Sequence, residues 1–251
     1  MTVLHVDLDN TLIYSYKHDI GTDRINIETH QGREISFLTK HTYENLKKIN
    51  EEVLIVPTST RSVEQYGRIN LGIGPIPYAL VCNGGILLAD GKKEAFWYQE
   101  SCRLAEDSLP ALEAAGRFLE RDHRRTFELR FIESLFLFTK CRHPEEVAAE
   151  LRNLVPADTV DVLCWKDKVY VVPKALNKGH AVERFRKYVP ADKVIAVGDG
   201  EFDVPMLRTA DIGIAPRGFC RQYSPDFTPD EMPGNEIFSD EMTDKILEIC
   251  K

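Results

Sequence analysis

Two acidic residues stand two positions apart in an otherwise apolar stretch near the start of the chain. The sequence opens MTVLHVDLDNTLIY, so Asp7 and Asp9 interrupt a run of valine, leucine and isoleucine residues. In a β-strand, residues i and i+2 share a face, so both carboxylates would point to one place. Burying two carboxylates together is costly unless a cation or a shared proton relieves their repulsion. The spacing therefore fits a divalent-cation site, a shared proton, or an ordinary solvated turn over residues 9–11.

Three further polar motifs lie directly after apolar runs or before helical patterns. TSTR follows VLIVP, Lys178 stands in ALNKG before a helical pattern, and GDGEFDVPML follows VIAV. Taken singly, a hydroxyl after a strand is usually a turn or a helix cap, and a lysine at a helix start is usually solvated. Open parallel sheets, however, bind ligands at the carboxyl ends of their strands. We therefore expect six side chains to converge: Asp7, Asp9, Ser59, Lys178, Asp199 and Asp203.

The apolar runs that carry these motifs predict a parallel sheet. Runs of strand length recur at 3–8, 53–57, 78–82 and 194–198. Segments whose apolar residues have helical spacing lie at 42–50 and 178–189. Continuous apolar strands that alternate with amphipathic helices are typical of a parallel sheet covered on both faces. The sequence therefore predicts an α/β protein with a Rossmann-like parallel-sheet core.

The middle of the chain has a different pattern. A hairpin is predicted around Asp90-Gly91, with three aromatic residues (96–98) alternating along its second strand. Pairs of strands then alternate with helices, the strands at 126–141 and 159–172 and the helices at 108–122 and 144–155. Such a pattern indicates a smaller α+β domain inserted into the first. We expect the core to comprise 1–85 and 173–251, and the inserted domain to comprise 86–172.

Composition limits the class of protein. The 251 residues are 43% hydrophobic and 29% charged, which is typical of a globular chain with a sizeable core. The net charge of −8 argues against a nonspecific nucleic-acid binder. No apolar run approaches the roughly 20 residues of a membrane helix, and no secretion signal is recognised. The six cysteines are irregularly spaced, which predicts reduced thiols in a cytoplasmic protein. From the charge and the lack of a long apolar run, we expect no nucleic-acid or membrane partner.

The order of the four motifs resembles that of the haloacid dehalogenase (HAD) superfamily. Members show DxDxT, a strand-end serine or threonine, a lysine and a final GDxxxD. Here these motifs read DLDNT at 7–11, TSTR at 58–61, NKG at 177–179 and GDGEFD at 198–203. The inserted domain is similar to the family's large α/β caps, most of all in the Cof-type subgroup, which includes sucrose-phosphate phosphatases. The resemblance covers the whole chain.

The sequence departs from the family pattern at a few positions. The second motif usually reads Thr-Gly-Arg, and here STR occupies 59–61, so we match its serine to the phosphate-binding hydroxyl, with Thr58 as the alternative. Phe202 stands where subgroup members usually carry asparagine, which leaves the role of Asp203 less defined. Asn10 replaces a common glycine in the first motif. None of these changes removes an acid or the lysine of the pattern.

The resemblance implies Mg²⁺-dependent phosphoryl transfer. Mg²⁺ prefers hard oxygen ligands, which the pattern supplies from the carboxylates of Asp7 and Asp199 and the main-chain carbonyl of Asp9. Asp7 would attack phosphorus and form an aspartyl-phosphate. Asp9 would protonate the leaving group and then deprotonate the water that cleaves the intermediate.

Further side chains would hold the phosphoryl group and the substrate. Ser59 would bond phosphoryl oxygens, Lys178 would supply fixed positive charge, and Asp203 would orient Lys178 or a metal-bound water. Weaker candidates for substrate contact, each also explained by a turn, a cap or a structural ion pair, are Thr11, Arg61, Asn83 and Lys174.

The function predicted is hydrolysis of a small phosphorylated metabolite, with a sugar phosphate indicated by analogy to the subgroup. A phosphosugar mutase of the same superfamily is the first alternative, and it would depend on an activating bisphosphate. A phospho-accepting signalling module is the second, although such modules are usually about half this size and lack an inserted domain. A non-catalytic sugar-phosphate binder is the third. The chain is expected to be a monomer or a homodimer.

Overall fold

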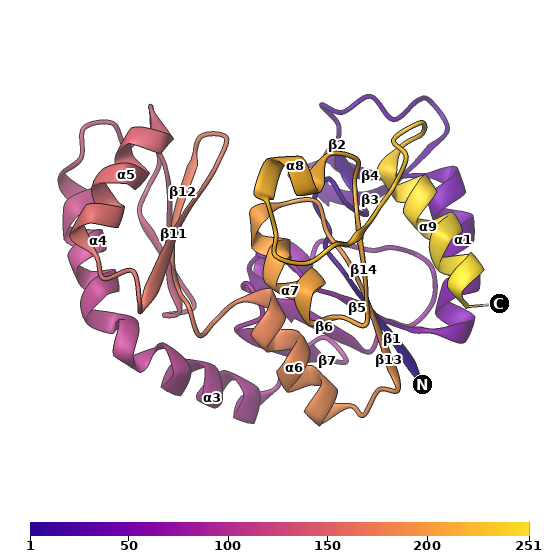
Figure 1. Cartoon of the computed structure of the whole chain (residues 1–251). Helices are drawn as coiled ribbons and strands as arrows, with labels where there is room; N and C mark the ends of the chain where they lie inside the picture. Colours follow the sequence, from indigo (N-terminus) through magenta and orange to yellow (C-terminus); the bar gives the residue numbers. More distant parts are fainter. Residues whose placement is uncertain (251) are drawn as a thin grey trace. The chain divides into compact units, whose positions relative to one another are not determined.

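A five-stranded parallel sheet forms the centre of the larger of two units in the computed structural model, which describes residues 1–250 (Figure 1). The larger unit, called the core unit below, comprises Met1–Lys93 and the chain from Lys178 onward. Its strands, in spatial order, are β15 (Asp230–Glu231), β14 (Ile212–Ala215), β13 (Lys193–Val197), β1 (Thr2–Val6) and β5 (Leu54–Pro57). Val6 pairs with both Val197 and Pro57, so the segments that follow β1, β5 and β13 begin at one edge of the sheet.

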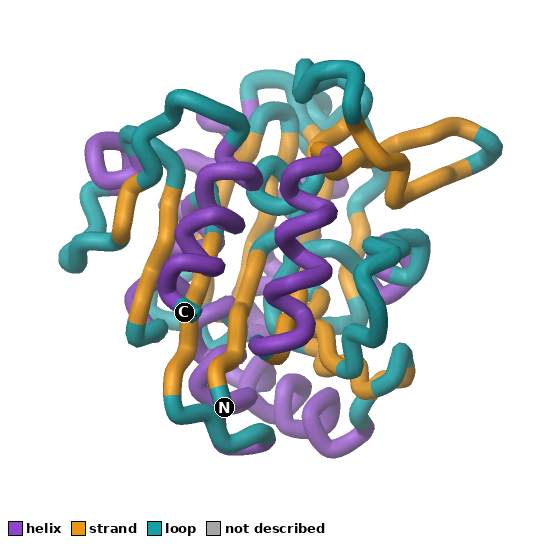
Figure 2. Tube along the Cα trace, turned by 90° about the vertical axis from the view of Figure 1, so that its right-hand side faces the viewer, coloured by secondary structure: helices purple, strands orange, loops and turns teal. Residues whose placement is uncertain are grey.

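Helices cover both faces of this sheet. One face carries α1 (Lys40–Glu52) and α9 (Phe238–Ile249), and the other carries α6 (Lys178–Tyr188) and α7 (Val204–Thr209) (Figures 1 and 2). Side chains of β13 point alternately to the two faces of the sheet. Ile195 packs in the apolar cluster that includes Leu46 and Met242. Its neighbour Ala196 packs in the cluster that includes Val182. The predicted α/β fold with a covered parallel sheet is confirmed.

Two small antiparallel sheets complete the core unit. One has the order β2-β4-β3, with β2 Tyr14–Ser15, β4 Arg33–Thr39 and β3 Arg24–His30. The pattern of apolar residues did not predict these strands. The other sheet has the order β6 (Tyr78–Val81), β7 (Ile86–Ala89) and β8 (Lys92–Lys93). The run at 78–82 was expected in the parallel sheet; instead β6 pairs antiparallel with β7, and a single parallel bridge from Leu80 to Thr58 links it to the end of β5.

The second unit, Glu94–Asn177, is built on a four-stranded antiparallel sheet. Its strands, in spatial order, are β11 (Val160–Trp165), β12 (Lys168–Pro173), β10 (Phe136–Lys140) and β9 (Arg130–Ile132). The helices α4 (Leu109–Arg121) and α5 (Pro144–Leu154) pack against it through one apolar cluster. The expected inserted domain was 86–172, but the hairpin of β7 and β8 pairs with β6 and so belongs to the core unit.

The four helices predicted from the sequence are present, and one segment predicted as a strand is a helix instead. The segment containing the aromatic residues 96–98 was expected to be a strand, and it forms α3 (Ala95–Ala105). The side chain of Glu94 accepts a hydrogen bond from the Trp97 backbone N–H at 2.6 Å and caps this helix. Trp97, Ser101 and Ala105 are buried at a spacing of four, so helical periodicity outweighs the short aromatic alternation. Among the helices of residues 1–250, none is both long and apolar enough to cross a membrane.

Candidate active site

Asp7 follows β1 and faces Lys178, the first residue of α6. The Lys178 ammonium donates to Oδ1 of Asp7 at 2.5 Å and to Oδ1 of Asp203 at 2.6 Å. All three side chains are buried, with Lys178 only 1% exposed. An ammonium between two carboxylates offsets part of the cost of removing the charges from water. Burial lowers the pKa of Lys178, but the charges of Asp203 and Asp7 outweigh it and raise that pKa above its ordinary value.

Two glycines allow this cluster to close. A Cβ at Gly179 would lie 2.5 Å from the carbonyl oxygen of Pro205, so only glycine lets the start of α6 approach α7 at this point. A Cβ at Gly198 would lie 2.3 Å from Cβ of Asp203. The glycines of the NKG and GDGEFD motifs therefore bring Lys178 and Asp203 together by allowing close backbone approach.

The loop after β13 is held by Asp203 from one side and by Thr11 from the other. Oδ2 of Asp203 accepts the backbone N–H groups of Asp199 and Gly200 at 3.1 and 2.9 Å. The hydroxyl of Thr11, which is fully buried, donates to Oδ1 of Asp199 at 2.9 Å. Thr11 was a candidate for substrate contact or a turn cap, and the structure pairs it with an acid of the last motif.

The acids of this cluster fit a divalent cation. Asp7, Asp199 and Asp203 offer oxygens within 4.8 Å of one another, against the single ammonium of Lys178. Burial raises the pKa of Asp7 well above its ordinary value, an effect that Lys178 opposes and the charges of Asp203 and Asp199 reinforce. Burial and the charge of Asp203 raise the pKa of Asp199 to about 7. Three hard oxygen donors with surplus negative charge are the environment that Mg²⁺ prefers.

The three clustered carboxylates are not the same set of residues as the predicted metal ligands. Asp7, Asp9 and Asp199 were expected, with Asp9 contributing its main-chain carbonyl, and the three clustered carboxylates are those of Asp7, Asp199 and Asp203. Both oxygens of Asp203 already accept hydrogen bonds, one from Lys178 and the other from backbone N–H groups. Asp7 and Asp199 are therefore the better placed carboxylates for a cation.

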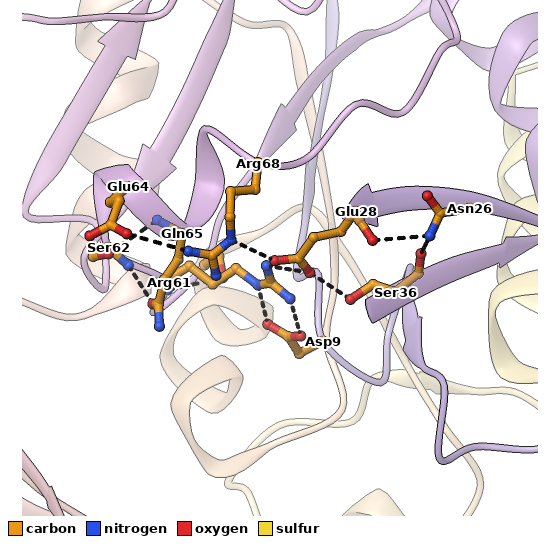
Figure 3. A network of polar contacts seen from close by, with 10 residues as sticks. Asp9, Asn26, Glu28, Ser36, Arg61, Ser62, Glu64, Gln65 and Arg68 are labelled. Carbon is orange, nitrogen blue, oxygen red and sulfur yellow. Dashed lines mark hydrogen bonds and ion pairs between the residues drawn. The ribbon is translucent and has the colours of Figure 1, made fainter. Parts of the chain in front are cut away.

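Asp9 has an environment unlike that of Asp7. Its side chain is 51% exposed and forms a two-pronged ion pair with Arg61, in which Nε and Nη2 each donate at 2.7 Å (Figure 3). Nη1 of Arg61 donates to Oε2 of Glu28 at 3.0 Å. Glu28 lies in β3 and is 1% exposed. Sequence reasoning named Asp9 and Arg61 but missed Glu28, whose only local signal is a glutamate directly after the alternating isoleucines of RINIETH.

Ser59 and Thr58 follow β5 and have different partners. Oγ of Ser59 accepts the backbone N–H of Arg61 at 3.2 Å, and the carbonyl of Ser59 accepts the N–H of Asn83 at 3.0 Å. The hydroxyl of Thr58 donates to the carbonyl two residues earlier at 3.1 Å and lies 3.0 Å from Nδ1 of His5. Thr58 is thus engaged with β1 and β5, whereas Ser59 belongs to the loop that carries Arg61.

One predicted residue belongs to the second unit, and the others belong to the core unit. Lys174 belongs to the second unit, where its ammonium pairs with Asp161 at 2.7 Å. All the other predicted residues lie in the core unit and form two bonded networks. The first contains Asp7, Thr11, Lys178, Asp199 and Asp203, and the second contains Asp9, Ser59, Arg61 and Asn83.

Comparison with known proteins agrees with the motif order. Residues 94–217 match the model of the haloacid dehalogenase-like hydrolases, a segment that includes Lys178, Asp199 and Asp203. No curated protein matches the sequence.

Solved structures share the fold over nearly the whole chain. The sucrose-phosphatase of Synechocystis sp. PCC6803, solved with sucrose and phosphate, is 16% identical with a TM-score of 0.68, over 98% of this chain and 96% of that one. A haloacid dehalogenase-like hydrolase from B. subtilis is 14% identical with a TM-score of 0.63, over 99% and 100%. The trehalose-6-phosphate phosphatase of Aspergillus fumigatus is 15% identical with a TM-score of 0.55, over 99% and 92%. The family match over residues 94–217 and the fold shared with these structures agree with the resemblance that the motifs indicated.

Proposed function

We propose that this protein is a Mg²⁺-dependent phosphomonoester hydrolase that works through an aspartyl-phosphate on Asp7. The observation that carries the proposal is the bond from the buried ammonium of Lys178 to Asp7 at the edge of the sheet where the motifs meet. A buried carboxylate with a fixed cation beside it suits a nucleophile that must approach an anionic phosphoryl group. The half-exposed Asp9 lies two residues away in a separate ion pair, as expected for an acid with a different task.

The residues divide the chemistry between them. A carboxylate oxygen of Asp7 attacks phosphorus, the ester P–O bond breaks, and Asp9 gives its proton to the departing alkoxide. Water then attacks the phosphorus of the aspartyl-phosphate, Asp9 takes a proton from that water, and Asp7 leaves as a carboxylate with release of phosphate. Lys178 stays beside Asp7 through both steps. The oxygen of the Ser59 hydroxyl accepts from the Arg61 N–H, and its hydrogen would donate to a phosphoryl oxygen.

Mg²⁺ fits the acids beside this nucleophile. Asp7 and Asp199, with the main-chain carbonyl of Asp9, would hold the ion. When bound, it would supply positive charge that reduces the repulsion between a carboxylate and a phosphate. The surplus of carboxylates over Lys178 and the raised pKa of Asp199 support this assignment.

We infer a phosphorylated sugar as the substrate class. The support is the fold shared with a sucrose-phosphatase and with a trehalose-6-phosphate phosphatase. Because one fold hosts many substrates, this part of the proposal rests on analogy. A cytoplasmic location and a monomeric or homodimeric state remain predictions from the sequence.

Phosphate release from a panel of sugar phosphates and a nitrophenyl phosphate tests the proposal. The wild-type protein is assayed with Mg²⁺ and with EDTA, beside Asp7→Asn and Asp9→Asn. We expect metal-dependent turnover that Asp7→Asn abolishes for every substrate, because the nucleophile is lost. We expect Asp9→Asn to lower kcat/KM by about a hundredfold or more for sugar phosphates, since an alkoxide needs a proton to leave. Nitrophenolate needs none, so its loss should be smaller.

Two outcomes would contradict the proposal. Phosphate release that Asp7→Asn leaves unchanged would show that another group attacks phosphorus. Turnover that appears only after a bisphosphate sugar is added would indicate a mutase, because such an enzyme returns the phosphoryl group to a sugar.

A further inference from the structure

Glu28 is a buried carboxylate that three donors surround. The Ser36 hydroxyl donates to its Oε2 at 2.6 Å, Arg61 Nη1 donates to the same oxygen at 3.0 Å, and Arg68 Nε donates to Oε1 at 3.1 Å (Figure 3). Burial raises the pKa of Glu28, but the Ser36 hydrogen bond and the charge of Arg61 outweigh burial and lower it below its ordinary value. Glu28 therefore stays ionised at neutral pH while only 1% of it is exposed.

The backbone of β3 is irregular at the residue that makes these bonds. The pairing of β3 with β4 shifts register between Asn26 and Glu28 and again between Glu28 and Thr29. The side-chain amide of Asn26 spans the irregularity, donating to the carbonyls of Glu28 and Ser36 at 3.0 and 3.2 Å. Register shifts of this kind re-aim a side chain and occur often beside active sites. Here the result is a glutamate buried directly beside the buried Ile27.

The two arginines come to Glu28 from either side of one short helix. Arg61 directly precedes Ser62, which caps α2 (Val63–Tyr66), and Arg68 follows the same helix. Ser62 and Gln65 form reciprocal capping bonds of 3.2 and 3.0 Å, which fix the chain next to Arg61. Arg61 lies between Glu28 and Asp9, and Arg68 lies between Glu28 and Glu64.

We propose that Glu28 is a positioning residue that fixes the carboxylate of Asp9 through Arg61. A guanidinium is planar and rigid, so the bond at Nη1 sets the direction in which Nε and Nη2 point. Glu28 and Asp9 occupy different edges of that fork, so Arg61 transmits the position of one carboxylate to the other. The side chain of Asp9, although half exposed, then has a defined location. This inference rests on the proposed function, in which Asp9 transfers the leaving-group proton.

The test is the dependence of kcat/KM on the leaving group in Glu28→Gln. A misplaced Asp9 slows the departure of an alkoxide and scarcely affects nitrophenolate. We therefore expect kcat/KM for the best sugar phosphate to fall about tenfold, and for nitrophenyl phosphate to fall less than about twofold. Glu64→Gln is the matched control, because Glu64 lies 3.7 Å from Arg68 and its side chain is 87% exposed, and we expect wild-type values for both substrates.

Two further variants separate positioning from folding. Glu28→Asp keeps the charge but shortens the side chain, so we expect a smaller selective loss, and this variant carries the test if Glu28→Gln does not fold. In an Asp9→Asn background, Glu28→Gln should add no further selective loss, because the group it positions is gone.

The outcomes distinguish this inference from the proposed function. No turnover by the wild-type protein would overturn both. Metal-dependent wild-type turnover with an equal loss for the two substrates in Glu28→Gln, or with no loss in either, would overturn the role of Glu28 alone. A selective loss that persists in the Asp9→Asn background would also overturn it, since Glu28 would then act by another route.

Discussion

Two cations of the core unit have parallel arrangements, each shared between a motif aspartate and a second buried acid. Lys178 bonds Asp7 and Asp203. Arg61 bonds Asp9 and Glu28. In both cases the second acid is almost fully buried, at 2% exposure for Asp203 and 1% for Glu28. In each case, the cation that bonds the motif aspartate is also bonded to the second, buried acid.

The two clusters differ in burial and in geometry. Asp7 is buried and bonds the compact ammonium of Lys178, whereas Asp9 is half exposed and bonds the planar guanidinium of Arg61. An ammonium acts as a point charge, so Lys178 mainly stabilises charge, while a guanidinium fixes direction through several bonds. The difference fits the proposed tasks, because a nucleophile facing an anion needs positive charge and a proton donor needs accurate placement.

Removing the cation of the first cluster should have the largest effect. Lys178→Met leaves Asp7 and Asp203 buried without their shared ammonium, so we expect phosphatase activity to fall by about a hundredfold or more. Breaking a buried ion pair from one side typically costs about 3–5 kcal/mol of unfolding free energy. Urea unfolding at alkaline and acidic pH measures this, and the loss should be smaller in acid, where Asp7 takes up a proton. A variant as stable as the wild type at alkaline pH would contradict the assigned role of Lys178.

A smaller effect is expected when the guanidinium of Arg61 in the second cluster is replaced by an ammonium. Arg61→Lys keeps the charge but cannot bond Asp9 in two places and Glu28 at once. We expect kcat/KM for sugar phosphates to fall about tenfold, while nitrophenyl phosphate changes little and unfolding shifts by about 1 kcal/mol or less. If lysine at this position supports full activity, charge alone suffices and the contrast between the clusters fails.

The smallest effect is the pH dependence of stability in the first cluster. The folded-state pKa of Asp199, about 7, lies above its ordinary value of 3.8. Its stabilising contribution is therefore full at low pH and is lost as the pH rises through about 7. Without metal, we expect unfolding free energy to fall by about 1 kcal/mol from about pH 6 to about pH 8.

Mg²⁺ should reverse that loss, because it binds the ionised carboxylates. Thermal unfolding with Mg²⁺ and with EDTA at the two pH values measures the difference. Equal stabilisation by Mg²⁺ in wild type and Asp199→Asn would remove this residue from the proposed metal site.

Several features of the site follow from local sequence. Apolar runs that end in polar motifs predict that Asp7, Ser59 and Asp199 meet at one edge, because parallel strands end together. The glycines of the NKG and GDGEFD motifs mark the close approaches, at Gly179 and Gly198. The capping glutamate and the spacing of four at 97–105 also signalled α3, but the aromatic alternation hid that signal.

The sequence by itself determined that Lys178 gathers with the acids Asp7, Asp199 and Asp203, because polar motifs at strand ends and at a helix start meet at one edge of a parallel sheet. Only the tertiary structure decided what Arg61 does, because its partners are Asp9, 52 positions away, and Glu28, 33 positions away. Glu28 had no periodic signal, since an irregular strand pairing rather than a regular alternation turns it inward. Pairing between distant segments and a local register shift are not encoded in any short window of sequence. The role of Glu28 as the second partner of Arg61 therefore became visible only in the fold.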